Sequence, residues 1–140
     1  MLQDIPYSLI CASSEADHNK ASLPASLEQY TWIEMSGTSC SHKHLQQFWR
    51  QHKLSPKQQI LCDYPQTIID LVCDGIGMAM VPTQKAEAAY QSGKTITILE
   101  QFRQTIPLHF IYLDEYEQDV SLQMLKQCIA EVWNLADDWH

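Results

Sequence analysis

The segment from residue 66 to 82 constrains the fold most, because it encodes a helix, a two-glycine turn and a buried strand in quick succession. Gly75 stands where a helix would end in a left-handed residue, and Gly77 allows a tight turn into the strand. The apolar run 78–81, closed by Pro82, is typical of a strand buried in a parallel sheet. The turn contains no Ser, Cys or Lys nucleophile, so the segment indicates a ligand-binding α/β unit rather than a catalytic one. Its helical part carries four apolar residues at helical spacing: Ile68, Ile69, Leu71 and Val72.

Size and charge exclude several classes of protein. A chain of 140 residues with 45% hydrophobic content can bury one core and has the size of one ordinary domain. Its formal charge of -8 argues against direct nucleic-acid binding by this chain. It has no apolar run long enough for a membrane span, and its first residues lack the pattern of a secretory signal. A cytoplasmic location without membrane attachment is expected.

The cysteines predict reduced thiols. There are five, an odd number, and none forms a C-x-x-C pair. Their apolar or helical surroundings fit a reducing compartment and argue against a disulfide framework.

Strand and helix patterns alternate along the chain. Strands are predicted at 7–12, 31–35, 59–62, 78–81, 95–99 and from Pro107 to Leu113. Helices are predicted at 40–52, 65–73, 83–90, with Thr83 as the cap, and 120–135, with a short helical turn at 26–30. This alternation predicts the α/β class, with a mainly parallel sheet flanked by helices.

Several landmarks occur in an order that resembles a known family. They are Leu9–Ala12 before a polar loop with His18, the strand pair Trp32-Ile33, the stretch 71–82, Ser92-Gly93 before a strand, and residues 107–112 before the last helix. Together they resemble the effector-binding region of LysR-type transcriptional regulators, a branch of the type II periplasmic-binding-protein-like fold.

The resemblance implies a division of the chain. Residues 1–95 would be effector-binding subdomain II, and residues 96–140 the crossover strand and C-terminal helix that return toward subdomain I. Family members carry a DNA-binding domain, a linker helix and the first half of subdomain I ahead of this region. The chain is therefore expected to be a C-terminal fragment with half of the effector cleft, and to bind effector weakly or not at all. Micromolar binding of a simple organic acid, measured by calorimetry, would contradict this.

The first candidate ligand site is the run Ser36, Gly37, Thr38 and Ser39, where hydroxyls and backbone N–H groups precede a helix. A helix N-terminus favours an anion, so a carboxylate would suit this turn. The alternative is that Ser39 or Thr38 only caps the helix. In proteins that resemble this chain the turn lines the effector cleft, which favours ligand contact by Ser36 and Thr38.

The second candidate site is the loop that contains Asp63, Tyr64 and Gln66. It follows a strand and begins a helix, and open α/β sheets bind ligands at the carboxyl ends of their strands. Tyr64 and Gln66 could supply specific hydrogen bonds. The alternative is an ordinary loop in which Asp63 caps the helix.

Other motifs are weaker. A lone Gly-x-Gly at 75–77 lacks the strand-first order of a dinucleotide fingerprint, so both glycines are interpreted as structural. Cys40 and His44 share a helix face, with His42 and His52 nearby, but solvent-facing histidines are a better interpretation than a metal site. The acidic residues between 114 and 119 are interpreted as a solvated loop.

The function implied by the resemblance is a non-enzymatic, ligand-sensing module that binds a small, anionic metabolite and controls transcription through an absent DNA-binding domain. No cofactor, metal or catalytic residue is expected. The apolar stripe at 120–133 predicts a homodimer. One alternative is a solute-binding protein of a transport system, which shares the two-lobed fold but needs an export signal. Another is a small enzyme; substitution of Cys62, Cys73 or His44 should leave the protein's properties unchanged if the sensing interpretation holds.

Overall fold

The computed structural model describes residues 2–15, 25–37 and 39–136. The strands are β1 (Gln3–Ala12), β2 (Trp32–Glu34), β3 (Gln59–Leu61), β4 (Met78–Pro82) and β5 (Ile96–Leu108). The α-helices are α2 (Cys40–Gln51), α3 (Pro65–Cys73), α4 (Thr83–Gln91) and α5 (Val120–Trp133). Short 3-10 turns are η1 (Ser13–Glu15), η2 (Ala25–Gln29) and η3 (Asp114–Tyr116). The chain divides into a larger unit, Pro6–Gln104, and a smaller unit, Met1–Ile5 with Thr105–His140.

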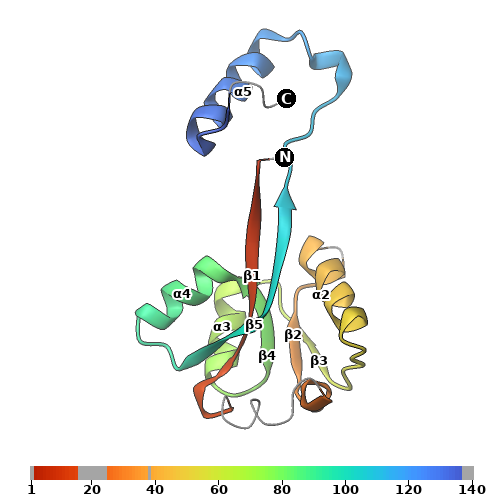
Figure 1. Cartoon of the computed structure of the whole chain (residues 1–140), viewed down its shortest axis with the longest axis vertical. Coiled ribbons are helices and arrows are strands. Elements are labelled where there is room, and N and C mark those ends of the chain that lie inside the picture. The colour runs from red at the N-terminus through yellow and green to blue at the C-terminus, as the bar shows by residue number, and fades with distance from the viewer. Residues whose placement is uncertain (1, 16–24, 38, 137–140) are drawn as a thin grey trace. The chain divides into compact units, whose positions relative to one another are not determined.

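The five strands form one sheet in the order β3-β2-β4-β1-β5 (Figure 1). β2 pairs in parallel with β3 and with β4, and β1 pairs antiparallel with β4. The backbone N–H of Leu2 donates to the carbonyl of Leu108, and that of Ser13 donates to Thr95, so β5 runs antiparallel to β1. Four strands therefore point one way and β1 alone points the other. The predicted α/β class with helices flanking the sheet is confirmed, and the sheet is mixed, since β2 pairs in parallel with β3 and β4 whereas β1 pairs antiparallel with β4 and β5.

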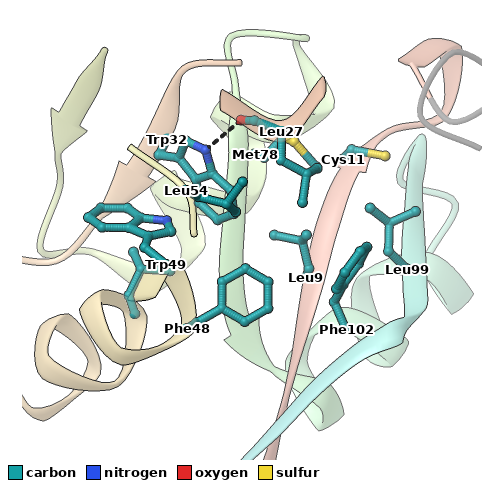
Figure 2. Close-up of a cluster of buried hydrophobic side chains, with 11 residues drawn as sticks. Leu9, Cys11, Leu27, Trp32, Phe48, Trp49, Leu54, Met78, Leu99 and Phe102 are labelled. Carbon is teal, nitrogen blue, oxygen red and sulfur yellow. Dashed lines mark hydrogen bonds between the residues drawn. The ribbon is translucent and has the colours of Figure 1, made fainter. Parts of the chain in front are cut away.

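Two apolar clusters cover the two faces of this sheet. Adjacent strand residues alternate between them, because successive side chains of a strand point to opposite faces. Thus Trp32 belongs to the cluster beneath α2, while Ile33 belongs to the one beneath α3 and α4. Trp32 is fully buried, and its indole N–H donates to the carbonyl of Leu27 at 2.9 Å (Figure 2). Its ring centroid lies 6.1 Å from that of Phe48 and 5.7 Å from that of Trp49. This aromatic group packs the last turn of α2 against β2.

The segment 66–82 folds as predicted, but the two glycines have different roles. Gly75 follows the end of α3 with a φ of 77°, in the left-handed region that glycine adopts at low cost. Gly77 has no such backbone requirement. A Cβ at this position would overlap the carbonyl oxygen of Thr31, which accepts the N–H of Met78 at 2.8 Å. Gly77 is therefore needed for the close approach of β4 to the start of β2.

The prediction that Thr83 caps α4 is wrong. The N-cap is Pro82, and Thr83 is the first helical residue. Its hydroxyl lies 2.6 Å from that of Ser8 on β1, and both residues are buried. Two buried hydroxyls satisfy each other here, which ties the start of α4 to the sheet.

The prediction of separate strands at 95–99 and 107–113 is also wrong. A single strand, β5, continues for 13 residues through the polar stretch that suggested a break, and residues 109–113 have no regular structure. Pairing with β1 explains the continuity, because hydrogen bonds from a neighbouring strand stabilise an extended backbone whatever its side chains. Pro107 lacks an N–H group and is tolerated because β5 lies at the edge of the sheet.

The last helix is confirmed at Val120–Trp133. The side chain of Asp119 accepts the N–H of Leu122 and so caps the first turn, and Asn134 ends the helix with a φ of 51°. No residue of α5 is buried. Within the described residues, no helix is both long and apolar enough to cross a membrane.

Candidate functional site

The two predicted ligand loops meet at the carboxyl ends of the parallel strands β2 and β3. The N–H of Cys62 donates to the carbonyl of Glu34 at 2.8 Å, which extends the pairing just beyond both strands. Past this point, the backbone N–H of Ser36 donates to Asp63 Oδ1 at 2.9 Å. Parallel neighbours end at the same edge of a sheet, so residues 27 or 28 positions apart in sequence become direct partners here. The structure thus brings together Ser36 and Asp63, which were predicted as members of two separate candidate sites.

Ser39 has the role that the alternative interpretation gave it. It is the N-cap of α2, and its hydroxyl accepts the N–H of His42 at 3.1 Å. Its own N–H donates to the carbonyl of Ser36 at 2.9 Å, which closes the turn before the helix. Gly37 is exposed, and a Cβ there would make only ordinary contact with the His42 ring. Thr38, also predicted as a ligand residue, lies outside the described residues.

The residues of the second loop have different partners: Asp63 contacts the first loop, whereas Gln66 contacts α3. Asp63 does not cap α3, because the N-cap is Tyr64 and makes no side-chain capping bond. Instead Asp63 joins the first loop through Ser36. Tyr64 is 74% exposed, so its ring and hydroxyl are open to solvent beside this junction. Gln66 is directed elsewhere, since its amide donates to Asp70 one turn along α3 at 3.3 Å.

A hydrogen-bonded pair of a buried glutamate and a partly buried histidine, which the sequence reasoning missed, lies directly beneath the first loop. Glu34, the last residue of β2, is only 4% exposed, and its Oε2 lies 2.8 Å from Nδ1 of His42 in the first turn of α2. An ionised carboxylate only accepts hydrogen bonds, so in that state Nδ1 carries the shared proton. The signal was present in the sequence: a glutamate at the end of an apolar strand needs a buried partner. The expectation that the histidines face solvent is wrong for His42.

The histidines and cysteine of α2 do not assemble as a metal site in the described residues. His52 packs against two aromatic rings, with centroid distances of 4.5 Å to Phe48 and 5.4 Å to Phe102. Cys40 is exposed, and among the residues the structure describes there is no group of three or more His, Cys, Asp or Glu that could hold an ion. The Glu34–His42 pair supplies only two ligands, whereas zinc sites use three or four from the protein.

The surroundings of Cys62 and Cys73 do not activate either thiol as a nucleophile. Cys62 donates a long hydrogen bond of 3.7 Å to the carbonyl of Tyr64. Burial raises the pKa of the Cys73 thiol, and the nearby positive charge of Lys94 opposes this only in part. A raised pKa lowers the fraction of thiolate, which is the nucleophilic form, so Cys73 is a poor nucleophile at neutral pH.

What the junction can offer a ligand follows from these contacts. The loop after β2 presents backbone N–H groups at the N-terminal end of a helix of 12 residues, where the helix dipole favours negative charge. One of these N–H groups already holds a carboxylate, that of Asp63. The exposed Tyr64 hydroxyl adds a donor at the rim. The junction therefore offers hydrogen-bond donors just beyond the carboxyl ends of β2 and β3.

Comparison with known proteins agrees with this architecture. Residues 2–134 match the family model described as the LysR substrate binding domain. The chain belongs to the LysR substrate binding domain family. This confirms the resemblance drawn from the order of the sequence landmarks, and it favours a LysR-type protein over a transport solute-binding protein or a small enzyme.

A curated relative is the HTH-type transcriptional regulator PgrR of Escherichia coli K12. It is 27% identical over 116 aligned positions, which cover 78% of this chain and 38% of PgrR. The chain thus spans well under half the length of this LysR-type relative.

Solved LysR domains share the fold. The effector domain of AmpR from Pseudomonas aeruginosa has a TM-score of 0.64 at 16% identity, covering 95% of this chain and 63% of that one. The regulatory domain of CcmR from Synechocystis PCC6803, in complex with 2-PG, has a TM-score of 0.68 at 16% identity, covering 94% and 64%. Full-length LysG from Corynebacterium glutamicum, with bound effector Arg, has a TM-score of 0.64 at 11% identity, covering 94% and 44%. The TM-scores show a common fold although the sequence identities are low.

Proposed function

We propose that this chain is a ligand-sensing part of a LysR-type transcriptional regulator, and that it binds a small anionic metabolite where Ser36 meets Asp63. It performs no catalysis. In this proposal residues 1–95 form effector-binding subdomain II, and residues 96–140 supply the crossover strand and helix that return toward subdomain I. Control of transcription would pass to a DNA-binding domain outside this chain, in the cytoplasm. The observation that carries the proposal is the 2.9 Å hydrogen bond from the Ser36 N–H to the Asp63 carboxylate.

That hydrogen bond supports an anionic ligand because a carboxylate of the protein itself, that of Asp63, already binds the Ser36 N–H as a ligand carboxylate would. The turn before α2 accepts a carboxylate from its own chain, in a position where the helix dipole stabilises negative charge. A ligand carboxylate would displace Asp63 from Ser36 or bind beside it. The buried Glu34–His42 pair fixes the turn from below, so the N–H groups keep their direction without a ligand.

The ligands of two structurally similar proteins support a small molecule, and not a polymer, as the ligand of this chain. The CcmR regulatory domain binds 2-PG, and LysG binds Arg as its effector. In signalling by this chain, the ligand would bind one of two conformations more tightly than the other and so shift their populations.

The proposal is tested by titrating the whole chain with small mono- and dicarboxylates while its backbone amides are observed by NMR. The amides of Ser36 and Gly37 should shift and saturate, with millimolar affinity, because only a few hydrogen bonds are gained. Asp63→Asn removes the competing charge and should strengthen binding about three- to five-fold.

The matched control is Asp74→Asn, which removes the same charge from an exposed residue just after α3. It should leave the affinity nearly unchanged. The proposal fails if no carboxylate shifts the Ser36 and Gly37 amides, or if the two substitutions have equal effects.

We also propose that the chain forms a homodimer through α5. No residue of this helix is buried, and it exposes a set of large apolar side chains: Val120, Met124, Leu125, Val132 and Trp133. Exposed apolar area of this kind is usually covered by another protein surface. A second copy of the chain offers the same apolar helix, and a symmetric pair would cover both surfaces in one closed contact.

A further inference from the structure

A hollow of about 250 Å³ lies between α3 and α4, away from the contact between Ser36 and Asp63. Its base is apolar, formed by the buried Ile69 of α3 and the buried Ala89 of α4. Its rim is polar and includes Gln66, Lys85, Ser92 and Lys94. At about 30 Å³ for each water in the liquid, the space equals about eight water molecules, enough for an ion of five to ten heavy atoms.

The charge at this rim contrasts with that of the chain. Only 9 of the 140 residues are Lys or Arg, against 17 Asp or Glu, yet two of the lysines line this one hollow. Lys85 makes no hydrogen bond or ion pair with any other residue in the described part of the chain. It therefore keeps three N–H donors for another partner.

The second lysine is held in place by an internal carboxylate. Lys94 Nζ lies 3.1 Å from Asp70 Oδ1, and the two side chains are 43% and 48% exposed. Gln66 donates to the same oxygen, so Asp70 gathers two of the donors at the rim. Ion pairs with this exposure contribute little free energy, so an incoming anion can replace Asp70 at Lys94 at small cost.

We propose that the hollow between α3 and α4 is a second ligand site, which takes a small oxyanion, carboxylate or phosphate, between Lys85 and Lys94. Gln66 supplies a neutral donor, and Asp70 acts as the internal competitor that the anion displaces. The site lies within the larger unit and is independent of the proposed effector contact at Ser36, so either site can fail without the other.

The test uses the whole chain, observed by NMR, with inorganic phosphate and malonate added separately at constant ionic strength. Saturable shifts are expected for the amides of Lys85, Ser92 and Lys94. Saturation by phosphate alone would assign the site to phosphorylated ligands, and saturation by malonate alone to dicarboxylates. Saturation by both would establish a general oxyanion site, and failure of both to saturate would overturn the proposal.

Four substitutions locate the binding. Lys85→Gln and Lys94→Gln should each weaken binding about three- to five-fold. Asp70→Asn should strengthen it by a similar factor, because Lys94 is released and a repelling charge is lost. Ala88→Leu fills the hollow from an exposed position of α4 and should abolish saturation, while leucine keeps the helix propensity high.

Lys57→Gln is the matched control, since Lys57 is exposed and lies before β3, outside the hollow. It should leave the affinity unchanged. The proposal is overturned if Lys57→Gln weakens binding as much as Lys85→Gln does, because the shifts would then report general screening. It is equally overturned if the folded Ala88→Leu variant binds as the unaltered chain does.

Discussion

His42 in the first turn of α2 is tied to Glu34 at the end of β2, with Nδ1 and Oε2 2.8 Å apart. The connecting turn is also held from the β3 side, where the Ser36 N–H donates to Asp63. The loop at the sheet edge is therefore anchored below and beside its backbone. A rigid loop positions N–H groups for a ligand without the entropic cost of ordering them.

Replacing His42 with alanine should destabilise the protein by about 1–3 kcal/mol, because Glu34 would remain buried without its hydrogen-bond partner. Urea unfolding followed by far-UV circular dichroism measures this difference. The double variant with Glu34→Gln should be less destabilised than the sum of the two single variants, since the penalty arises from one partner left alone.

The control is His44→Ala, on the same helix and outside the pair. Its effect should stay within about 0.5 kcal/mol, as is usual for positions without a specific partner. Additive effects of the Glu34 and His42 substitutions would show that the contact does not couple them.

The two glycines should respond differently to alanine. Gly75→Ala places a Cβ in open space at a φ of 77°, so only the left-handed backbone penalises it, by about 1–2 kcal/mol. Gly77→Ala brings a Cβ into the carbonyl of Thr31 and requires β2 and β4 to move apart, at a cost of about 3 kcal/mol. Thermal and urea denaturation of both variants give the ranking. An equal effect of the two substitutions would contradict the close approach at Gly77.

The part of the fold that the sequence predicts well depends on local signals. In the segment 66–82 the helical spacing, Gly75 and Pro82 each act on their own neighbours, and α3 and β4 begin and end close to the predicted residues. β5 differs because its length depends on β1, some ninety residues earlier, and no periodicity within 96–108 indicates that pairing. Thr83 is similar, since it hydrogen bonds to Ser8 instead of capping α4.

The candidate site also combines features that the sequence predicts with features that depend on contacts between separate elements. The meeting of Ser36 and Asp63 was predictable, because parallel strands place their following loops at one edge of the sheet. In contrast, the direction that a side chain takes on a helix was not predictable from the sequence. Gln66 lies in the first turn of α3, and its amide donates along the helix to Asp70 and not into the loop that contains Asp63. The burial of Glu34 was not predicted either, since it depends on the hydrogen bond with His42 of α2.

The Asp70–Lys94 pair should make a stability contribution that depends on pH in a definite direction. Hydrogen bonds from Lys94 and then Gln66 lower the pKa of Asp70 below 3.8, so its contribution is full above that value and is lost as the pH falls through the lowered pKa. The hydrogen bond and charge of Asp70 raise the pKa of Lys94 above 10.5, so that contribution is full below 10.5 and is lost at higher pH.

Lys94→Met should therefore be slightly less stable than the unaltered chain between about pH 5 and pH 9, and equally stable once Asp70 is protonated. Urea midpoints across this range measure the difference. About 1 M salt should reduce it, because both side chains are solvent-exposed. A difference that grows as the medium becomes acidic would have the wrong sign for this pair.

Cys73 should react more slowly with iodoacetamide than the exposed thiol Cys40. Burial raises its pKa, so less of it is thiolate near neutral pH. Lys94→Met should slow Cys73 further, because the positive charge of Lys94 lowers that pKa. Mass spectrometry of timed samples resolves each site, and Cys40 serves as the internal control. Faster labelling of Cys73 in this variant would contradict the electrostatic contribution of Lys94.

The exposed helix α5 should determine the oligomeric state. Leu125 and Val132 are seven residues apart, two helical turns, so they lie on one face and are 48% and 75% exposed. Light scattering should give the unaltered chain a mass of twice 16.1 kDa, whereas Leu125→Glu with Val132→Glu should give a monomer, because paired helices would bury the new charges. Gln127→Glu adds charge to an exposed polar position of the same helix and should leave the dimer intact. Since α5 buries no residue within the chain, neither variant should alter the unfolding of the larger unit, and a monomer at all concentrations for the unaltered chain would exclude this interface.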